Sequence, residues 1–214
     1  MKPRSCSTVA TAFVLVTLAA AVMPSRAAAE DCTWSVAPDA VKVEWTAFKF
    51  TNKTGVTGTF TKSTLSGPGS ADSLVGLAKG LQMTIDGASI ESNNPARNLT
   101  IRDFFFAKFV PDPKIRGRAT AASGDDHRGT IEIEITLNGV SRTVPFAYTI
   151  GPDNQVEATA SIDMLDFQLD AAHASIHETC EQQHTGEDGV AKTWTTVGLA
   201  LRGKFTKTCR AGGH

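Results

Sequence analysis

Apolar and polar residues alternate along much of the chain, a pattern typical of β-strands that bury one face. The clearest run is IEIEITL at 131–137, in which aliphatic residues alternate with acids and a threonine. Shorter runs of the same kind cover 41–45 and 81–86. Further strands are expected at 56–61, 115–122, 143–150, 156–164 and 193–205. The pattern therefore predicts about eight half-buried antiparallel strands.

Turn-forming residues separate these runs and indicate how they are connected. Asn138-Gly139 and the sequence GPDN at 151–154 have the composition of tight hairpin turns. Consecutive hairpins favour an up-and-down barrel, although a two-sheet sandwich fits the same number of strands. Only two segments have a helical pattern, so helices cannot cover both faces of such a sheet. We therefore predict an all-β fold: an eight-stranded antiparallel β-barrel with one or two short helices.

The two helical segments are expected at 95–102 and 166–182. Asn93 or Asn94 is placed to cap the first helix. In the second, Asp166 is placed as the cap, and apolar, histidine and cysteine residues recur at spacings of three and four.

The amino-terminal segment has the composition of a secretory signal peptide. A basic start is followed by a mostly apolar run at 6–23 and by three alanines at 27–29. Polar residues interrupt the run, and no second apolar segment of spanning length follows, which argues against an integral membrane protein. We expect a signal peptide at 1–29 and one domain at 30–214.

Loss of that segment changes the charge balance. Lys2, Arg4 and Arg26 leave with it, so 18 of the 21 basic residues remain beside all 22 acidic residues, a net charge of about −4. Such a balance gives no general attraction to nucleic acid, and no nucleic-acid partner is expected.

The expected mature chain contains three cysteines, Cys32, Cys180 and Cys209. In an oxidising compartment an odd number predicts one disulfide and one free thiol. A closed barrel brings the two chain ends together, which favours the pair Cys32–Cys209. The spacing alone does not exclude the other two pairings.

The segment DFFFAKF at 103–109 concentrates four of the eleven phenylalanines in seven positions. Three adjacent aromatic rings cannot all enter one ordinary core face. Two interpretations follow. The segment either borders an apolar cavity at the mouth of the barrel or forms a core packed from two sides, and the interior of an eight-stranded barrel suits either use.

Four stretches carry a resemblance to a known family. They are VEWTAFKFTNKTGVTGTF at 43–60, ASIESNNPARNLTIRDFFF at 88–106, TIEIEITLNGVSRTVPF at 130–146 and SIDMLDF at 161–167. In these stretches the chain resembles the YceI-like polyisoprenoid-binding family of bacterial periplasmic proteins. The resemblance implies a lipocalin-like barrel in the periplasm whose apolar interior holds an isoprenoid chain, or an amide or fatty acid in some relatives.

The resemblance predicts a carrier of isoprenoid-type or other long-chain amphiphilic lipids, with that lipid in place of any cofactor. Whether the chain forms a homodimer is left open. Eight residues are expected to line the lipid cavity: Trp45, Phe48, Phe60, Met83, Phe104, Phe106, Phe109 and Ile133. These assignments depend on strand register, because a slip of one residue turns every side chain to the other face.

Two arginines beside the aromatic segment are candidates for binding a lipid headgroup. The planar guanidinium groups of Arg97 and Arg102 suit a carboxylate or pyrophosphate. The alternative for Arg102 is an ordinary ion pair with Asp103. Asn98 stands where many members of the family carry an acid, so the polar network around Arg97 is expected to differ.

A metal site is the main alternative function. His173, His177, Cys180 and His184 fall on one stripe of the second predicted helix, and all are good metal ligands. On a straight helix they span about 16 Å, so only two or three could share an ion, with help from elsewhere. The other interpretation is that they lie at the seam between helix and barrel.

Catalytic motifs do not fit the sequence. His177-Glu178 begins like HExxH, but Glu181 occupies the position of the second histidine. We also find no GxSxG, Walker or CxxC motif, and we expect no enzyme. Three hypotheses remain: a lipid carrier, a metal- or haem-binding protein, and a barrel packed solid with its own side chains.

Overall fold

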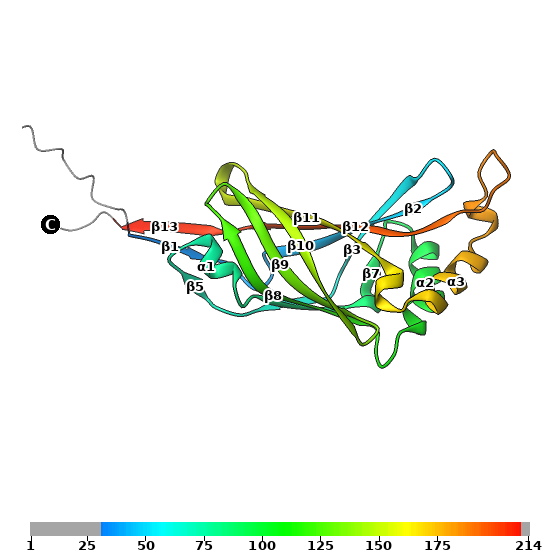
Figure 1. The fold of residues 1–214 in the computed structure, drawn as a ribbon, viewed down its shortest axis with the longest axis horizontal. Helices are drawn as coiled ribbons and strands as arrows, with labels where there is room; N and C mark the ends of the chain where they lie inside the picture. Colours follow the sequence, from blue (N-terminus) through cyan, green and yellow to red (C-terminus); the bar gives the residue numbers. More distant parts are fainter. Residues whose placement is uncertain (1–30, 211–214) are drawn as a thin grey trace, which may run out of the picture.

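A computed structural model of the chain describes residues 31–210 (Figure 1). The predicted signal peptide at 1–29 lies outside the described residues. The strands are β1 (Asp31–Ser35), β2 (Val41–Lys49), β3 (Thr54–Phe60), β4 (Ser63–Ser66), β5 (Ser70–Ala71), β6 (Gln82–Asp86), β7 (Ile90–Glu91), β8 (Lys114–Gly124), β9 (Arg128–Leu137), β10 (Val140–Ile150), β11 (Gln155–Asp163), β12 (Thr193–Lys204) and β13 (Thr206–Arg210). The α-helices are α1 (Leu74–Ala78), α2 (Pro95–Phe104) and α3 (Asp170–Thr179).

Ten strands form one curled antiparallel half-barrel sheet in the order β4-β6-β8-β9-β10-β11-β12-β2-β3-β7. The prediction of a mostly β fold with few helices is confirmed, whereas the prediction of an eight-stranded barrel is wrong. The number of strands is ten instead of eight because two extended segments each form two separate strands. The segment 54–66 bends at Thr61 and Lys62, so that β3 pairs with β2 and β4 pairs with β6. A 3₁₀ turn, Gly87–Ser89, separates β6 from β7.

The predicted hairpins position the longest strands of the sheet. Asn138 and Gly139 have φ values of 51° and 74°, the left-handed backbone that a tight turn between β9 and β10 requires. Asp153 and Asn154 have φ values of 57° and 58° between β10 and β11. Because these turns fix the register, Ile131, like every second residue after it in β9, faces the concave side of the sheet.

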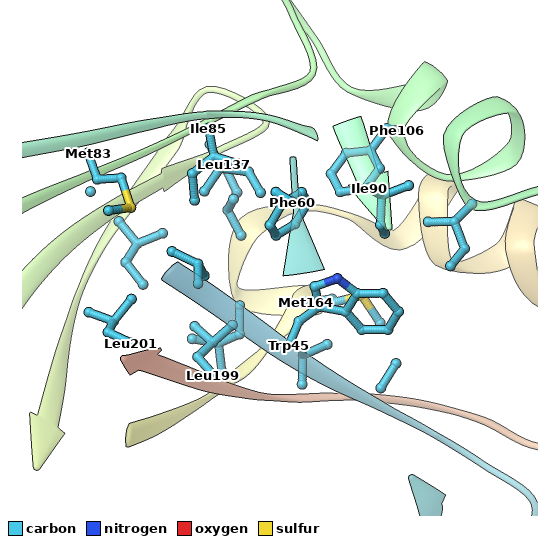
Figure 2. Close-up of a pocket in the computed structure, with 18 of the residues that line it drawn as sticks. Trp45, Phe60, Met83, Ile85, Ile90, Phe106, Leu137, Met164, Leu199 and Leu201 are labelled. Carbon is cyan, nitrogen blue, oxygen red and sulfur yellow. The ribbon is translucent and has the colours of Figure 1, made fainter. Parts of the chain in front are cut away.

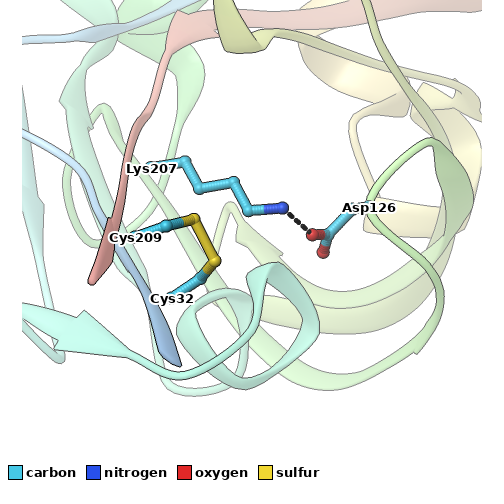
Figure 3. Close-up of a disulfide and its surroundings, with 4 residues drawn as sticks. All are labelled: Cys32, Asp126, Lys207 and Cys209. Atoms are coloured by element: carbon cyan, nitrogen blue, oxygen red, sulfur yellow. Dashed lines mark hydrogen bonds and ion pairs between the residues drawn. A yellow bond between two sulfur atoms is a disulfide. The ribbon is translucent and has the colours of Figure 1, made fainter. Parts of the chain in front are cut away.

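A second sheet of three strands, in the order β13-β1-β5, joins the two ends of the described chain. Cys32 and Cys209 are register partners in β1 and β13 and form a disulfide across a sequence separation of 177 (Figure 3). The predicted pairing is confirmed, and Cys180 is free. Figure 3 also shows the ion pair between Lys207 and Asp126, 2.7 Å apart, which links β13 to the β8–β9 turn.

Helices lie at both ends of the main sheet (Figure 1). The unpredicted helix α1 contacts β8, β5 and β1, and its Leu77 is fully buried. At the other end α2 packs against α3. The helix expected at 95–102 is confirmed, with the Asn94 side chain accepting a hydrogen bond from the backbone N–H of Arg97 at 3.0 Å.

The second predicted helix is shorter than expected. Residues 164–167 form a 3₁₀ helix capped by Asp163, so Asp166 is not a cap. Gln168 then adopts a left-handed backbone with φ 55°, which ends that helix before α3 begins. Cys180 is the carboxyl-terminal cap of α3, and His184 lies beyond it in a separate 3₁₀ turn. None of the helices in the described range 31–210 is long and apolar enough to cross a bilayer.

Candidate binding cavity

The concave side of the sheet borders a cavity of about 700 Å³ (Figure 2). This volume falls within the range of small-molecule binding sites. Four long strands contribute side chains mainly at every second position, as expected for a pleated strand. From β2, β8, β9 and β12 these residues are Val41, Val43, Trp45 and Ala47; Ile115, Gly117 and Ala119; Ile131, Ile133, Ile135 and Leu137; and Val197, Leu199, Leu201 and Gly203.

One end of the cavity is closed by apolar packing. Leu74 and Ala78 of α1 line the cavity there and are buried. Trp34 of β1 and Leu77 of α1, which do not line the cavity, are 1% and 0% exposed and belong to the buried core at this end. Phe205, between β12 and β13, also lines this region.

The predicted wall residues largely fall where expected. Seven of the eight line the cavity: Trp45, Phe48, Phe60, Met83, Phe106, Phe109 and Ile133. Phe104 does not, and the prediction for it is wrong. It is the last residue of α2 and is 43% exposed, because the segment is helical there and does not alternate as a strand does. Phe105, which we did not assign, lines the cavity instead.

Three rings of the aromatic segment form one cluster. The centroids of Phe105, Phe106 and Phe109 lie 5.1 to 5.3 Å apart, at distances typical of favourable aromatic pairs. Phe60 of β3 approaches the Phe106 ring edge-on at 6.1 Å. Gly87 makes room for this cluster, since a Cβ atom there would come within 2.4 Å of the Phe106 ring. The segment therefore borders the cavity and packs against its own rings.

Arg97 lines the cavity and is held in place by Ser92. Its Nε–H donates to Ser92 Oγ at 2.8 Å, and its Nη2 donates to the Ser92 carbonyl oxygen at 2.6 Å. Ser92 is only 4% exposed, and its hydroxyl donates to Asn98 Oδ1 at 2.6 Å. Asn98 therefore accepts the hydrogen bond that orients the serine, which in turn orients the arginine.

Arg102 does not reach the cavity. Its Nε–H donates to Asp103 Oδ1 at 2.8 Å, and both side chains are about half exposed. The hydrogen bond from Arg102 lowers the pKa of the Asp103 carboxyl. The geometry matches the ion-pair alternative and places Arg102 away from any ligand in the lumen.

The three histidines of the metal hypothesis converge on one threonine of β12. His177 Nδ1 and His184 Nδ1 lie 3.0 and 2.7 Å from Thr193 Oγ1, and His173 Nε2 lies 3.1 Å from the Thr193 carbonyl oxygen. The rings of His173 and His177 stack at a centroid distance of 6.1 Å. These contacts fasten α3 and the turn after it to the sheet.

Burial governs the titration of this region. It lowers the pKa of His184, and electrostatic interactions with Lys49 and His177 lower it further. Burial also raises the pKa of the Cys180 thiol, which Lys49 partly offsets. Both groups are therefore held in their uncharged forms near neutral pH.

The described residues do not assemble a metal centre. Within 31–210, no three side chains of His, Cys, Asp or Glu are grouped so that they could hold an ion. A site built from His173, His177, Cys180 and His184 would require these side chains to rearrange, and it stays a prediction.

Several polar residues of the cavity, Lys49 and Thr193 among them, were not assigned from the sequence. Lys49 lines the cavity. Its position could have been predicted from the sequence, because Lys49 follows Trp45 and Ala47 at every second position of β2 and so faces the same side of the sheet. Thr193 lines the cavity too, but its role arises from the packing of α3 on β12, which no local pattern predicts.

A single antiparallel sheet curled around an apolar cavity defines a class of small half-barrel β-proteins. Within this class the chain belongs to the YceI-like family, whose domain model matches residues 34–205.

Two solved structures are similar in fold. One is a polyisoprenoid binding domain from Saccharophagus degradans implicated in plant cell wall breakdown, with 17% identity, a TM-score of 0.52, and coverage of 83% of this chain and 98% of that one. The other is BcnA from Burkholderia cenocepacia, with 16% identity, a TM-score of 0.52, and coverage of 78% and 97%. No curated protein matches the chain by sequence.

Proposed function

We propose that the protein is a periplasmic carrier that holds an isoprenoid-type or other long-chain amphiphilic lipid in its cavity. The observation that carries this proposal is the apolar wall around about 700 Å³. Each buried methylene contributes about 0.8 kcal/mol, so a tail of about ten carbons supplies on the order of 8 kcal/mol before the costs of binding. The similar Saccharophagus degradans domain, described as polyisoprenoid-binding, supports the same use.

Binding rather than catalysis agrees with the chemistry of the lining. The Cys180 thiol borders the cavity, but burial raises its pKa and so disfavours the thiolate that a nucleophilic cysteine needs. The family is one of binding domains, which supports the same conclusion.

The proposed location rests on two features. The segment 1–29 has the pattern of an export signal, and the Cys32–Cys209 disulfide is of the kind that persists in oxidising compartments. Cell fractionation by osmotic shock tests this part: we expect a shortened chain in the periplasmic fraction, and full-length protein in the cytoplasm would refute it.

Native mass spectrometry tests the carrier itself. Protein purified from its own host without detergent should carry a lipid-sized adduct, and stripped protein should take up a long-chain prenyl alcohol. The Gly117→Phe variant should lose both properties, because a Cβ at this inward position meets only Ile133, at 3.5 Å, and a ring would project into the lumen.

The matched control is Thr120→Phe, which adds the same ring to an exposed position of the same strand and should leave uptake unchanged. Wild-type protein that carries no adduct and takes up no alcohol would refute the carrier function.

A further inference from the structure

The charged residues that line the cavity are all cationic. They are Lys49, Arg97 and Arg116, and among the described lining residues there is no aspartate or glutamate. The chain as a whole carries 22 acidic and 21 basic residues, so its composition does not account for this bias.

Two of the three charges lack an acidic partner. Arg116 Nη2 lies 3.0 Å from Asp112 Oδ2, and this exposed pair neutralises it. Within residues 31–210, neither Lys49 nor Arg97 has a carboxylate oxygen within 4.0 Å of its side-chain nitrogens. Both side chains are partly buried beside an apolar lumen, a position that favours a ligand that brings the missing negative charge.

Arg97 is oriented for such a ligand. A guanidinium has five N–H donors, and Ser92 accepts from only two of them, one on Nε and one on Nη2. The donors on Nη1 remain for a ligand, while the buried Ser92 fixes the plane of the group. An oriented guanidinium with free donors matches the oxygens of a carboxylate or phosphate.

Lys49 supplies the second charge at the same end of the molecule. It is the last residue of β2, whose end lies at the same end of the molecule as α2 and α3 in Figure 1. Its Nζ lies 3.5 Å from the Gln183 carbonyl oxygen and 4.4 Å from the centroid of the Phe50 ring. His184 lines the cavity nearby, but its lowered pKa keeps it neutral, so it adds a hydrogen-bonding group and no further charge.

We propose that the bound lipid has an anionic head, a carboxylate or a phosphate, which Arg97 and Lys49 bind at the α2/α3 end while the tail extends toward α1. This inference rests on the carrier function proposed above and narrows its ligand class. Uncharged lipids with the same tail bind more weakly because they leave the two cations unpaired.

A series of ligands with one tail and different heads tests the inference. Isothermal titration of stripped protein at about pH 8, where a carboxylic acid is ionised, compares a long-chain fatty acid, the monoalkyl phosphate and the primary alcohol. A hydrogen bond to a charged group contributes about 1.5 to 3 kcal/mol, so the two anions should bind roughly 10- to 100-fold more tightly than the alcohol.

Substitutions assign the preference to the proposed residues. Arg97→Gln should weaken binding of the acid about tenfold or more and should reduce the ratio of acid affinity to alcohol affinity. Lys49→Met should reduce the preference independently. The matched control is Arg102→Gln, because this arginine of the same helix lies outside the cavity and pairs with Asp103. Thermal melts verify folding, and Arg97→Lys, which keeps the charge without the fork, should retain part of the preference.

The outcomes separate this inference from the carrier function. Equal affinity for acid and alcohol in the wild type, or a preference that survives both substitutions, would overturn the anionic head and leave the carrier standing. Absence of binding by every lipid would overturn the carrier itself. Inorganic phosphate should not displace the acid, and displacement that Arg97→Gln abolishes would indicate a free-anion site instead of a lipid headgroup site.

Discussion

At the α1 end the cavity is lined by the buried apolar side chains of Leu74 and Ala78, and α1 contacts β1 and β5 of the disulfide-linked second sheet. At the α2/α3 end the same cavity is bordered by Arg97, Lys49 and His184. The first end is built for stability and for excluding water, whereas the second presents donors and positive charge. Substitutions at the α1 end should therefore lower stability, and those at the α2/α3 end should act on the ligand, on pH dependence and more weakly on stability.

The largest effect is expected from the disulfide behind α1. Cys32→Ser should lower the free energy of unfolding by about 3 to 5 kcal/mol, because the bridge closes a loop with a sequence separation of 177. Urea denaturation followed by circular dichroism measures the change. Cys180→Ser is the control, since Cys180 is free, and it should change stability far less. Equal losses for the two variants would mean that the bridge does not hold the closed end.

Shortening a buried side chain of α1 should have the next largest effect on stability. Leu77 is 0% exposed, so Leu77→Ala should cost about 2 to 5 kcal/mol through lost burial and the cavity it leaves. Leu99→Ala is the matched control at the other end, where the side chain is 50% exposed, and it should stay within about 0.5 kcal/mol of wild type. A comparable loss in both variants, measured by the same denaturation, would contradict the contrast between the two ends.

Substitution of Thr193, the threonine that connects α3 to β12, should have a smaller effect on stability. Thr193→Val keeps the shape but removes the hydroxyl that contacts His177 and His184, which should cost about 1 to 3 kcal/mol. Thr196→Val, on the same strand, is the control, because its hydroxyl makes no hydrogen bond within the described residues. Faster hydrogen exchange in 170–184 in the first variant alone would locate the loss in α3; unchanged exchange there would contradict the role of Thr193.

The smallest effect is a pH dependence at the same place. The pKa of His184 is lower in the folded chain than its ordinary value, so the unfolded chain binds this proton more readily. Stability should therefore decrease as the pH falls below about 6.5 toward the folded-state pKa.

His184→Gln should weaken this dependence between about pH 7.5 and 5.5, where carboxylates contribute little. Urea midpoints across that interval measure the difference between the two proteins. Parallel curves would show that His184 does not titrate in this way.

The sheet was largely predictable because its signals are local. Alternation in 131–137 and the Asn138-Gly139 turn fixed β9 and β10, and period two placed Trp45 and Ile133 on the wall. The number of strands was not predictable in this way, because the break at Thr61 and Lys62 depends on pairing with residues 86–89.

The helical parts depend on backbone details that periodicity does not contain. The predicted helix start at 166 rested on Asp166 as a cap, but the left-handed φ of 55° at Gln168 separates α3 from the 3₁₀ helix before it. Phe104 was misassigned because alternation was assumed for a segment that is helical. The meeting of three histidines at Thr193 joins α3 and the turn after it to β12, which no spacing along one helix predicts.

The bridge between Cys32 and Cys209 has a further consequence for a protein proposed to work in the periplasm, should its backbone be cut. Nearly every loop of the described chain lies between the two cysteines. A single backbone cut in any of them yields two fragments that stay covalently joined through sulfur. A nicked molecule therefore keeps its full mass on a non-reducing gel, and its two pieces separate only after a thiol is added.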